Sequence, residues 1–101
     1  LSKLIAGNPN IVGLYSLGGG TRGVIGAIDS AEQKISMVTT ELSQHTRAAL
    51  ISGTVDAVLV QDPSHEVRSA IRVLRALVDE APINEKQERI RIEIFMRDNL
   101  P

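Results

Sequence analysis

Hydrophobic positions along the chain form short apolar runs that alternate with longer stretches at helical spacing. The short runs are rich in branched residues, which is typical of buried strands, and they cover residues 11–15, 34–40 and 56–60. The stretches that follow them place apolar residues three and four positions apart, and they cover residues 21–28, 43–51 and 64–81. This alternation predicts three strand–helix units in a mostly parallel sheet.

The stretch at 64–81 has the strongest helix signal. Asp62 can cap this helix, and Pro63 suits its first position, where a missing N–H costs nothing. One face is apolar over its whole length, formed by Val67, Ala70, Ile71, Leu74, Leu77, Val78 and Ala81. Because this face is longer than three short strands need, we expect it to pack on something outside this chain.

The remaining segments are shorter and simpler. Residues 1–6 resemble the end of a helix, with Gly7 as its terminator, and residues 80–88 read as a polar connection. Residues 89–95 alternate isoleucine with charged side chains, which indicates a strand with one wet face, at an edge or in an antiparallel position. Residues 98–101 form a tail, and no polar linker divides the chain.

Composition narrows the functional classes. At 43% hydrophobic residues, with one Tyr, one Phe and no Trp, the 101-residue chain can build a single aliphatic core. A net charge of -1 offers no electrostatic support for nucleic-acid binding by this segment. The chain has no cysteine and no apolar run of roughly 20 residues, so we expect no disulfide, no thiolate metal site and no membrane span. The predicted class is α/β, a three-layer mostly parallel sheet with flanking helices.

Three polar residues stand where the predicted parallel strands end. They are Ser16, Glu41 and Gln61. Parallel neighbouring strands end at one edge of a sheet, where ligands of open α/β sheets bind. A hydroxyl, a carboxylate and an amide there suit a neutral polyhydroxyl ligand. The alternative is that these residues are ordinary caps and turn formers.

The glycines 18–20 form the other noticeable motif. Backbone N–H groups before a helix attract anions, and Glu41 stands near the spacing of a ribose-binding acid. The segment nevertheless lacks the Lys-Ser/Thr of a P-loop. Residues 18–23 fit the letters of G-x-G-x-x-G, but a dinucleotide site also needs an acid about 20 residues further on, and Glu41 is only near that distance. A plain turn is the preferred interpretation over nucleotide binding, and we expect no cofactor.

No catalytic or metal-binding constellation emerges from the sequence. His45 and His65 fall in first helical turns, with no nucleophile-elbow motif and no zinc-ligand spacing near them, so we expect solvated histidines. The arginines 68, 72 and 75 fit the solvated face of their helix better than a phosphate site. An enzyme on a flavodoxin-like sheet is the third functional class, and the sequence offers no catalytic residues for it.

Residues 52–63, SGTVDAVLVQDP, resemble the "dGkidAtvaQdP" stretch of type I periplasmic-binding-protein domains. This family includes ribose- and galactose-type sugar-binding proteins and the effector domains of the bacterial LacI/GalR transcriptional regulators. Residues 37–41, MVTTE, are similar to the family's "vvGfD", and residues 10–28 to its strand, polar residue and helix. The ending at 89–101, RIRIEIFMRDNLP, resembles the last strand of LacI-type regulators.

The resemblance implies that residues 1–101 are the C-terminal portion of an effector-binding domain. The DNA-binding head and most of the N-terminal subdomain would then lie outside the chain, and the helix at 64–81 would belong to that other subdomain. The fold implied is a flavodoxin-like half of a type I periplasmic-binding-protein fold. The family's ligand contacts fall on Ser16, Glu41 and Gln61; only Gln61 is identical, since Ser16 replaces Asn or Asp and Glu41 replaces Asp.

The function expected from the resemblance is effector binding within a cytoplasmic LacI-type regulator that is not an enzyme. The effector would be a sugar or a sugar derivative, DNA would bind through the absent domain, and the protein would be a homodimer without a membrane partner. The alternative is a periplasmic sugar-binding protein of a transporter.

Overall fold

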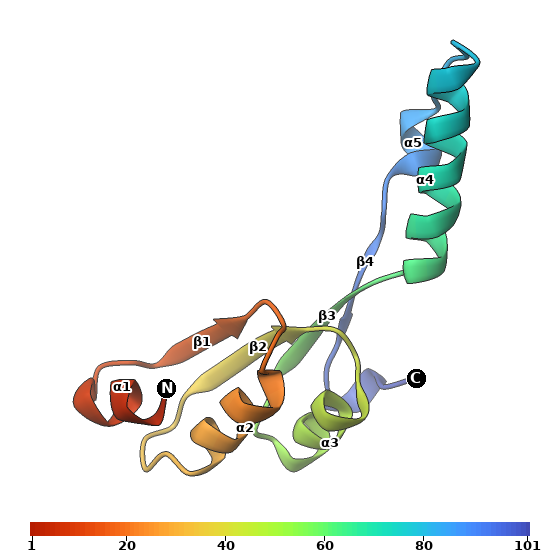
Figure 1. Ribbon diagram of the computed structural model, residues 1–101. Helices are drawn as coiled ribbons and strands as arrows, with labels where there is room; N and C mark the ends of the chain where they lie inside the picture. The colour runs from red at the N-terminus through yellow and green to blue at the C-terminus, as the bar shows by residue number, and fades with distance from the viewer. The chain divides into compact units, whose positions relative to one another are not determined.

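The computed structural model describes all 101 residues, Leu1–Pro101, and the chain forms two compact units. The first unit contains residues 1–60 and 94–101, and the second contains residues 61–93. The chain passes from one unit to the other inside strand β3 (Ala57–Gln61) and again inside strand β4 (Ile92–Phe95) (Figure 1). The boundary therefore lies in regular structure and not in a polar linker.

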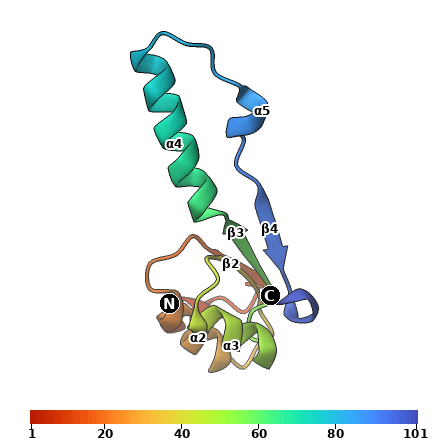
Figure 2. The same cartoon turned by 90° about the vertical axis from the view of Figure 1, so that its right-hand side faces the viewer.

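A four-stranded sheet in the order β1-β2-β3-β4 organises the first unit. Strand β1 (Gly13–Ser16) pairs in parallel with β2 (Ser36–Thr40), and β2 pairs in parallel with β3. The last strand, β4, takes the edge position expected from its alternating pattern and runs opposite to β3 (Figure 2). The prediction of an α/β fold with a mostly parallel sheet is confirmed.

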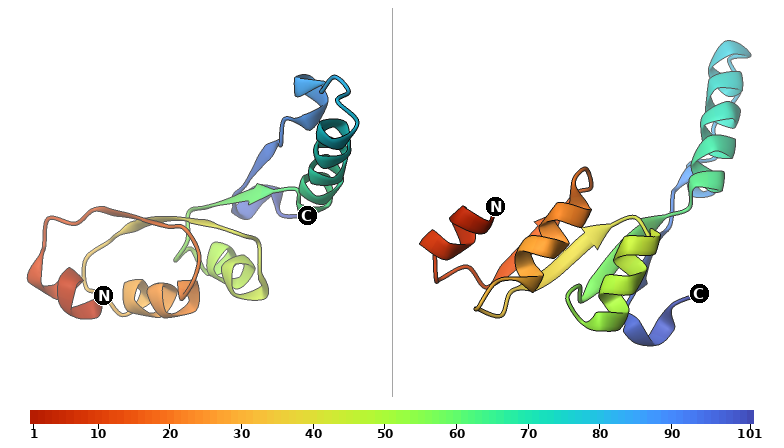
Figure 3. Two further views of the ribbon diagram at one scale, coloured as in Figure 1. Left: turned by 45° about the horizontal axis from the view of Figure 1, so that its top comes forward. Right: turned by 60° about the horizontal axis from the view of Figure 1, so that its bottom comes forward.

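Helices α2 (Thr21–Asp29) and α3 (Gln44–Ser52) lie against the same face of this sheet (Figure 3). Crossovers of one hand between strands in consecutive order place every connecting helix on the same side. The opposite face presents Tyr15, which is 54% exposed. The helices that a third layer would need on that face are not supplied by the first unit.

The core lies between the sheet and these helices and is aliphatic, as the composition predicted. Met37 and Val58 of the central strands are fully buried, and Leu50 of α3 packs on them. The short N-terminal helix α1 (Ser2–Gly7) adds Ile5 to the same cluster. The other buried apolar members are Ile28, Ile35, Ala49 and Val55.

Helix α3 begins and ends where the sequence predicted. Ser43 caps it by accepting a hydrogen bond from the Thr46 N–H at 3.2 Å, and the Thr46 hydroxyl accepts from the Ser43 N–H at 2.7 Å. At the other end Gly53 has φ 88°, the left-handed conformation that glycine adopts without steric cost.

Several predicted boundaries are wrong in detail. Gly7 is the last residue of α1, and Asn8 is its C-cap. The expected strand at 89–95 is regular only over Ile92–Phe95. The polar connection at 80–88 contains a single helical turn, α5 (Glu85–Glu88), capped by Asn84. A turn this short has no apolar face, so hydrophobic periodicity cannot reveal it.

The second unit is built on helix α4 (Pro63–Val78). Its start is as predicted, because Pro63 opens the helix and the Asp62 carboxylate accepts from the N–H groups of Ser64 and His65. It ends three residues before the expected Ala81. There Glu80 takes φ 53° and the Ala81 N–H bonds to the Ala76 carbonyl at 2.9 Å, which closes the helix with a Schellman motif.

The apolar face of α4 is exposed in this chain. Its larger side chains are each at least 60% exposed, and they are Val67, Ile71, Leu74, Leu77 and Val78. Within the second unit, polar contacts join α4 to α5.

Glu88 is the centre of those contacts. Its carboxylate accepts a hydrogen bond from the buried Ser69 hydroxyl at 2.6 Å and forms an ion pair with Arg72 at 2.8 Å. Arg72 is therefore not the freely solvated residue expected from the arginine row, although Arg68 remains exposed. The Ser69 hydrogen bond first, and the Arg72 guanidinium second, lower the pKa of Glu88 below its ordinary value of 4.5.

Asp56 fixes the register between β2 and β3, which generates a first prediction. Its carboxylate accepts from the Met37 N–H at 2.8 Å, and its own N–H donates to the Met37 carbonyl at 2.9 Å. Asp56→Ala leaves the Met37 N–H without this acceptor and should lower the free energy of unfolding by about 1 kcal/mol. Asp56→Asn retains an acceptor and should cost less. If urea unfolding gave the same loss of unfolding free energy for Asp56→Ala and Asp56→Asn, this role would be contradicted.

The Glu88 contacts predict a pH dependence of stability. Because the folded pKa is lowered, the carboxylate stabilises the folded state fully above its ordinary value of 4.5. The contribution is lost as the pH falls below that value. The melting temperature of the wild type should therefore exceed that of Glu88→Gln above pH 4.5, and the difference should shrink as the pH falls below that value. Glu85→Gln, in the same turn, removes a carboxylate that contacts neither Ser69 nor Arg72 and serves as the control. A pH-independent difference for Glu88→Gln would contradict the assignment.

Candidate ligand-binding site

The predicted site residues lie at the carboxyl ends of the parallel strands. Ser16 is the last residue of β1, Glu41 directly follows β2, and Gln61 is the last residue of β3. Because β1, β2 and β3 are parallel neighbours, these ends share one edge of the sheet. Ser16 and Glu41 belong to the first unit and Gln61 to the second, so their joint contact with one ligand stays a prediction.

Ser16 is the most enclosed of the three, with 8% of its surface exposed. Its hydroxyl lies 3.4 Å from the hydroxyl of Thr21, the first residue of α2. Its carbonyl accepts a hydrogen bond at 3.2 Å from Thr39, a fully buried residue of the neighbouring strand. The long hydroxyl–hydroxyl distance means that Ser16 Oγ can give up this weak contact for a ligand at small cost.

Glu41 is exposed and has an unusual backbone. Its φ is 69°, in the left-handed region that residues with a Cβ rarely adopt. Its N–H donates to the Leu59 carbonyl of β3 at 3.1 Å, and its carbonyl accepts from the Thr46 hydroxyl of α3 at 2.9 Å. Residues held in such conformations cluster at functional sites, where surrounding contacts maintain the strain.

Gln61 is exposed and precedes the Asp62-Pro63 start of α4. The Asp62 carboxylate is occupied by the first N–H groups of that helix. The amide of Gln61 carries both a donor and an acceptor.

The three glycines between β1 and α2 form a tight left-handed turn. Their φ angles are 110° at Gly18, 58° at Gly19 and 75° at Gly20. Gly20 is the N-cap of α2, and its carbonyl accepts from the Val24 N–H at 3.1 Å. The backbone conformation by itself requires glycine here, which supports the turn interpretation.

The two histidines differ in environment. His45 is exposed on α3, as expected. His65 is half-buried, and its Nε2 lies 2.9 Å from the Gln87 carbonyl, so it takes part in joining α4 to the segment at α5. No group of three or more histidine and acidic side chains is arranged to hold a metal ion. None of the helices has both the length and the apolar character that crossing a membrane requires.

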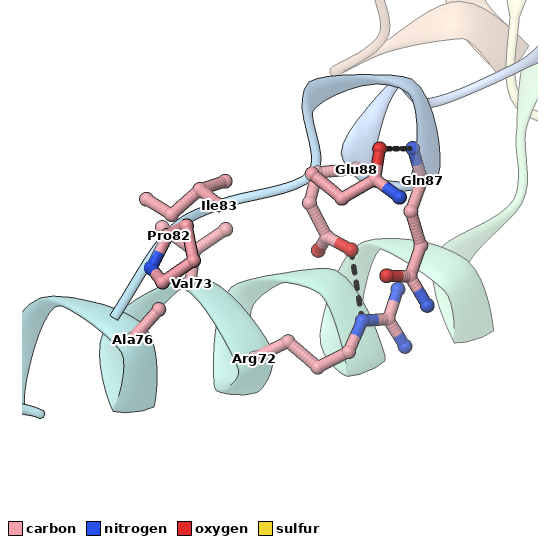
Figure 4. A pocket seen from close by; sticks show the side chains of 8 residues that line it. Arg72, Val73, Ala76, Pro82, Ile83, Gln87 and Glu88 are labelled. Carbon is pink, nitrogen blue, oxygen red and sulfur yellow. Dashed lines mark hydrogen bonds and ion pairs between the residues drawn. The ribbon is translucent and has the colours of Figure 1, made fainter.

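Sequence reasoning missed a hollow of about 170 Å³ beside α4 in the second unit. Figure 4 shows Val73 and Ala76 of the helix opposite Pro82 and Ile83, with the Arg72–Glu88 ion pair at one end. At this end the Arg72 guanidinium and the Glu88 carboxylate are already paired with each other. The helical spacing of Arg72, Val73 and Ala76 was the available signal, but it does not reveal which later residues face them.

The chain is similar in sequence to one protein family and in structure to several solved proteins. A family model described as a periplasmic binding protein domain matches residues 1–82. No curated protein sequence matches the chain.

Three solved structures share the fold. GanP, a glucose-galactose binding protein from Geobacillus stearothermophilus, matches 98% of the chain with 18% identity and a TM-score of 0.81. A carbohydrate transporter solute binding protein from Agrobacterium radiobacter, in complex with D-arabinose, matches 97% with 23% identity and a TM-score of 0.77. A LacI transcriptional regulator from Bacteroides fragilis, itself described as putative, matches 96% with 15% identity and a TM-score of 0.70.

The chain spans 36%, 34% and 34% of the lengths of these three proteins. Their likeness therefore establishes the fold of this part. The match over residues 1–82 covers most of the sequence and extends through β1, β2, β3 and α4. The chain belongs to the periplasmic binding protein domain family.

Proposed function

We propose that the chain is the effector-binding part of a LacI-type transcriptional regulator and that its effector is a sugar or a sugar derivative. The observation that carries this proposal is the parallel pairing of β1, β2 and β3, which brings Ser16 and Glu41 to one edge of the sheet. Gln61, at the end of β3, is the third residue that we assign to the ligand.

The chemistry of these groups favours a neutral ligand with several hydroxyls. The Glu41 carboxylate accepts from two hydroxyls, the Gln61 amide both donates and accepts, and the Ser16 hydroxyl does either. These side chains bind and orient, and the proposal assigns them no chemical step. Two structural neighbours are described as sugar-related, a glucose-galactose binding protein and a carbohydrate transporter protein with D-arabinose.

The choice of a regulator over a transport protein is supported by two features. The ending at 89–101 resembles that of LacI-type regulators, and one structural neighbour is described as a LacI regulator. In this proposal the protein is a cytoplasmic homodimer that binds DNA through a separate domain. Sugar binding would change its affinity for DNA by favouring one of two conformations.

The alternative is a periplasmic sugar-binding protein of a transporter, favoured by the two sugar-related neighbours. The N-terminal sequence of the full-length protein discriminates the two functions. A helix-turn-helix there supports the regulator, and DNA binding that responds to sugar in fluorescence anisotropy supports it further. A cleavable signal peptide without DNA binding would contradict it.

Gln61 provides a direct test of the proposed site. Gln61→Ala in the full-length protein should weaken sugar binding by about 1–3 kcal/mol, because ligand hydroxyls lose their partner. Titration calorimetry with D-galactose, D-glucose and D-arabinose measures this. Lys34→Ala, which lies before the first residue of β2 and so beyond the opposite end of the sheet, is the control and should leave the affinity unchanged. Unchanged affinity in Gln61→Ala would refute the assignment.

Glu41 predicts opposite effects on stability and binding. Glu41→Gly removes the Cβ that makes φ 69° costly, so it should raise the free energy of unfolding by about 0.5–1 kcal/mol. It also removes the carboxylate and should weaken sugar binding about tenfold or more. Glu41→Ala should weaken binding equally without the gain in stability. Chemical unfolding and calorimetry on the same samples check both; equal stability of the two variants would show that the backbone is unstrained.

A further inference from the structure

Thr46 is a hydroxyl residue in the first turn of α3 that is almost completely buried, with 2% of its surface exposed. Its Oγ1 lies 2.9 Å from the Glu41 carbonyl and 3.2 Å from the Ser43 carbonyl. A hydroxyl has one proton, and the Glu41 carbonyl is the nearer acceptor. The Ser43 N–H donates to the same Oγ1 at 2.7 Å.

These contacts fix the backbone on both sides of Glu41. The Glu41 N–H is held by the Leu59 carbonyl of β3, and the Glu41 carbonyl is held by Thr46 of α3. With both peptide groups anchored, φ and ψ of Glu41 are determined by its neighbours. The left-handed conformation persists because releasing it would break a hydrogen bond to a buried hydroxyl.

We propose that Thr46 is a positioning residue for ligand binding: it holds Glu41 in the left-handed conformation and thereby directs the Glu41 carboxylate along the ligand edge of the sheet. This inference rests on the proposed function, and it deepens the account of the same site. Thr46 itself does not touch the ligand. Its effect on binding passes entirely through Glu41.

A purely structural role is the competing explanation, because Ser43 and Thr46 also form the capping box of α3. The cap needs only the contacts between these two residues. The bond from Thr46 to the Glu41 carbonyl lies outside the cap and links it to the strand end. Ser43→Ala therefore serves as a matched control, since it removes the cap acceptor and leaves that bond in place.

The binding test uses the full-length protein and calorimetry with D-galactose, D-glucose and D-arabinose. Thr46→Val should weaken binding about three- to tenfold, and Thr46→Ser, which keeps the hydroxyl, should restore it. Thr46→Val should cause no further loss in a Glu41→Ala background. Ser43→Ala should lower thermal stability with unchanged affinity. An equal loss with and without the Glu41 carboxylate would overturn the proposal.

A second measurement needs no ligand. Glu41→Gly should raise the midpoint of chemical unfolding in the wild-type background and raise it by a smaller amount in the Thr46→Val background, because Thr46→Val already releases the strain. An equal gain in both backgrounds would overturn the positioning role. If the wild type binds none of the three sugars, the proposed function is contradicted, and this stability comparison decides the role of Thr46 by itself.

Discussion

The parallel pairing of β2 with both of its neighbours is the constraint on which the rest of the structure depends. It places Thr39 beside Val58, both fully buried, and directs all three strand ends toward one edge. The hydrogen bonds between Asp56 and Met37 fix the register of β2 against β3 before the regular pairing begins. A shift of one residue between these strands would turn either Thr39 or Val58 out of the core and misalign the strand ends.

Two buried hydroxyl groups support the carboxyl edge of the parallel strands from inside the sheet and helix α3. Thr39 bonds to the carbonyl of Ser16, and Thr46 bonds to the carbonyl of Glu41. Both threonines are buried, and these two bonds are made to backbone carbonyls and not to the side chains of Ser16 and Glu41. The residues that hold the backbone at the strand ends, Thr39 and Thr46, are therefore different from the residues whose side chains stand at those ends. Rigid support of this kind lowers the entropic cost of binding.

Local signals explain why much of the fold is predictable. The Asp62-Pro63 pair, the Ser43 cap and the Gly53 terminator each act within a few residues, and the structure has each of them at the expected place. Glu88 was not predictable, because its partners Ser69 and Arg72 are 19 and 16 residues away. The left-handed conformation of Glu41 was also hidden, since glutamate carries no sequence signal for a positive φ. The strand ends were correctly located, whereas the strain that orients Glu41 arises from tertiary contacts.

The position of the boundary between the two units affects where proteases can cut the chain. The chain crosses it twice, each time within a strand, at residues 60–61 and 93–94. Residues within paired strands lack the flexibility of exposed loop tips, which are the preferred sites of proteolytic cleavage. Limited proteolysis should therefore trim the loops of either unit before it separates the two.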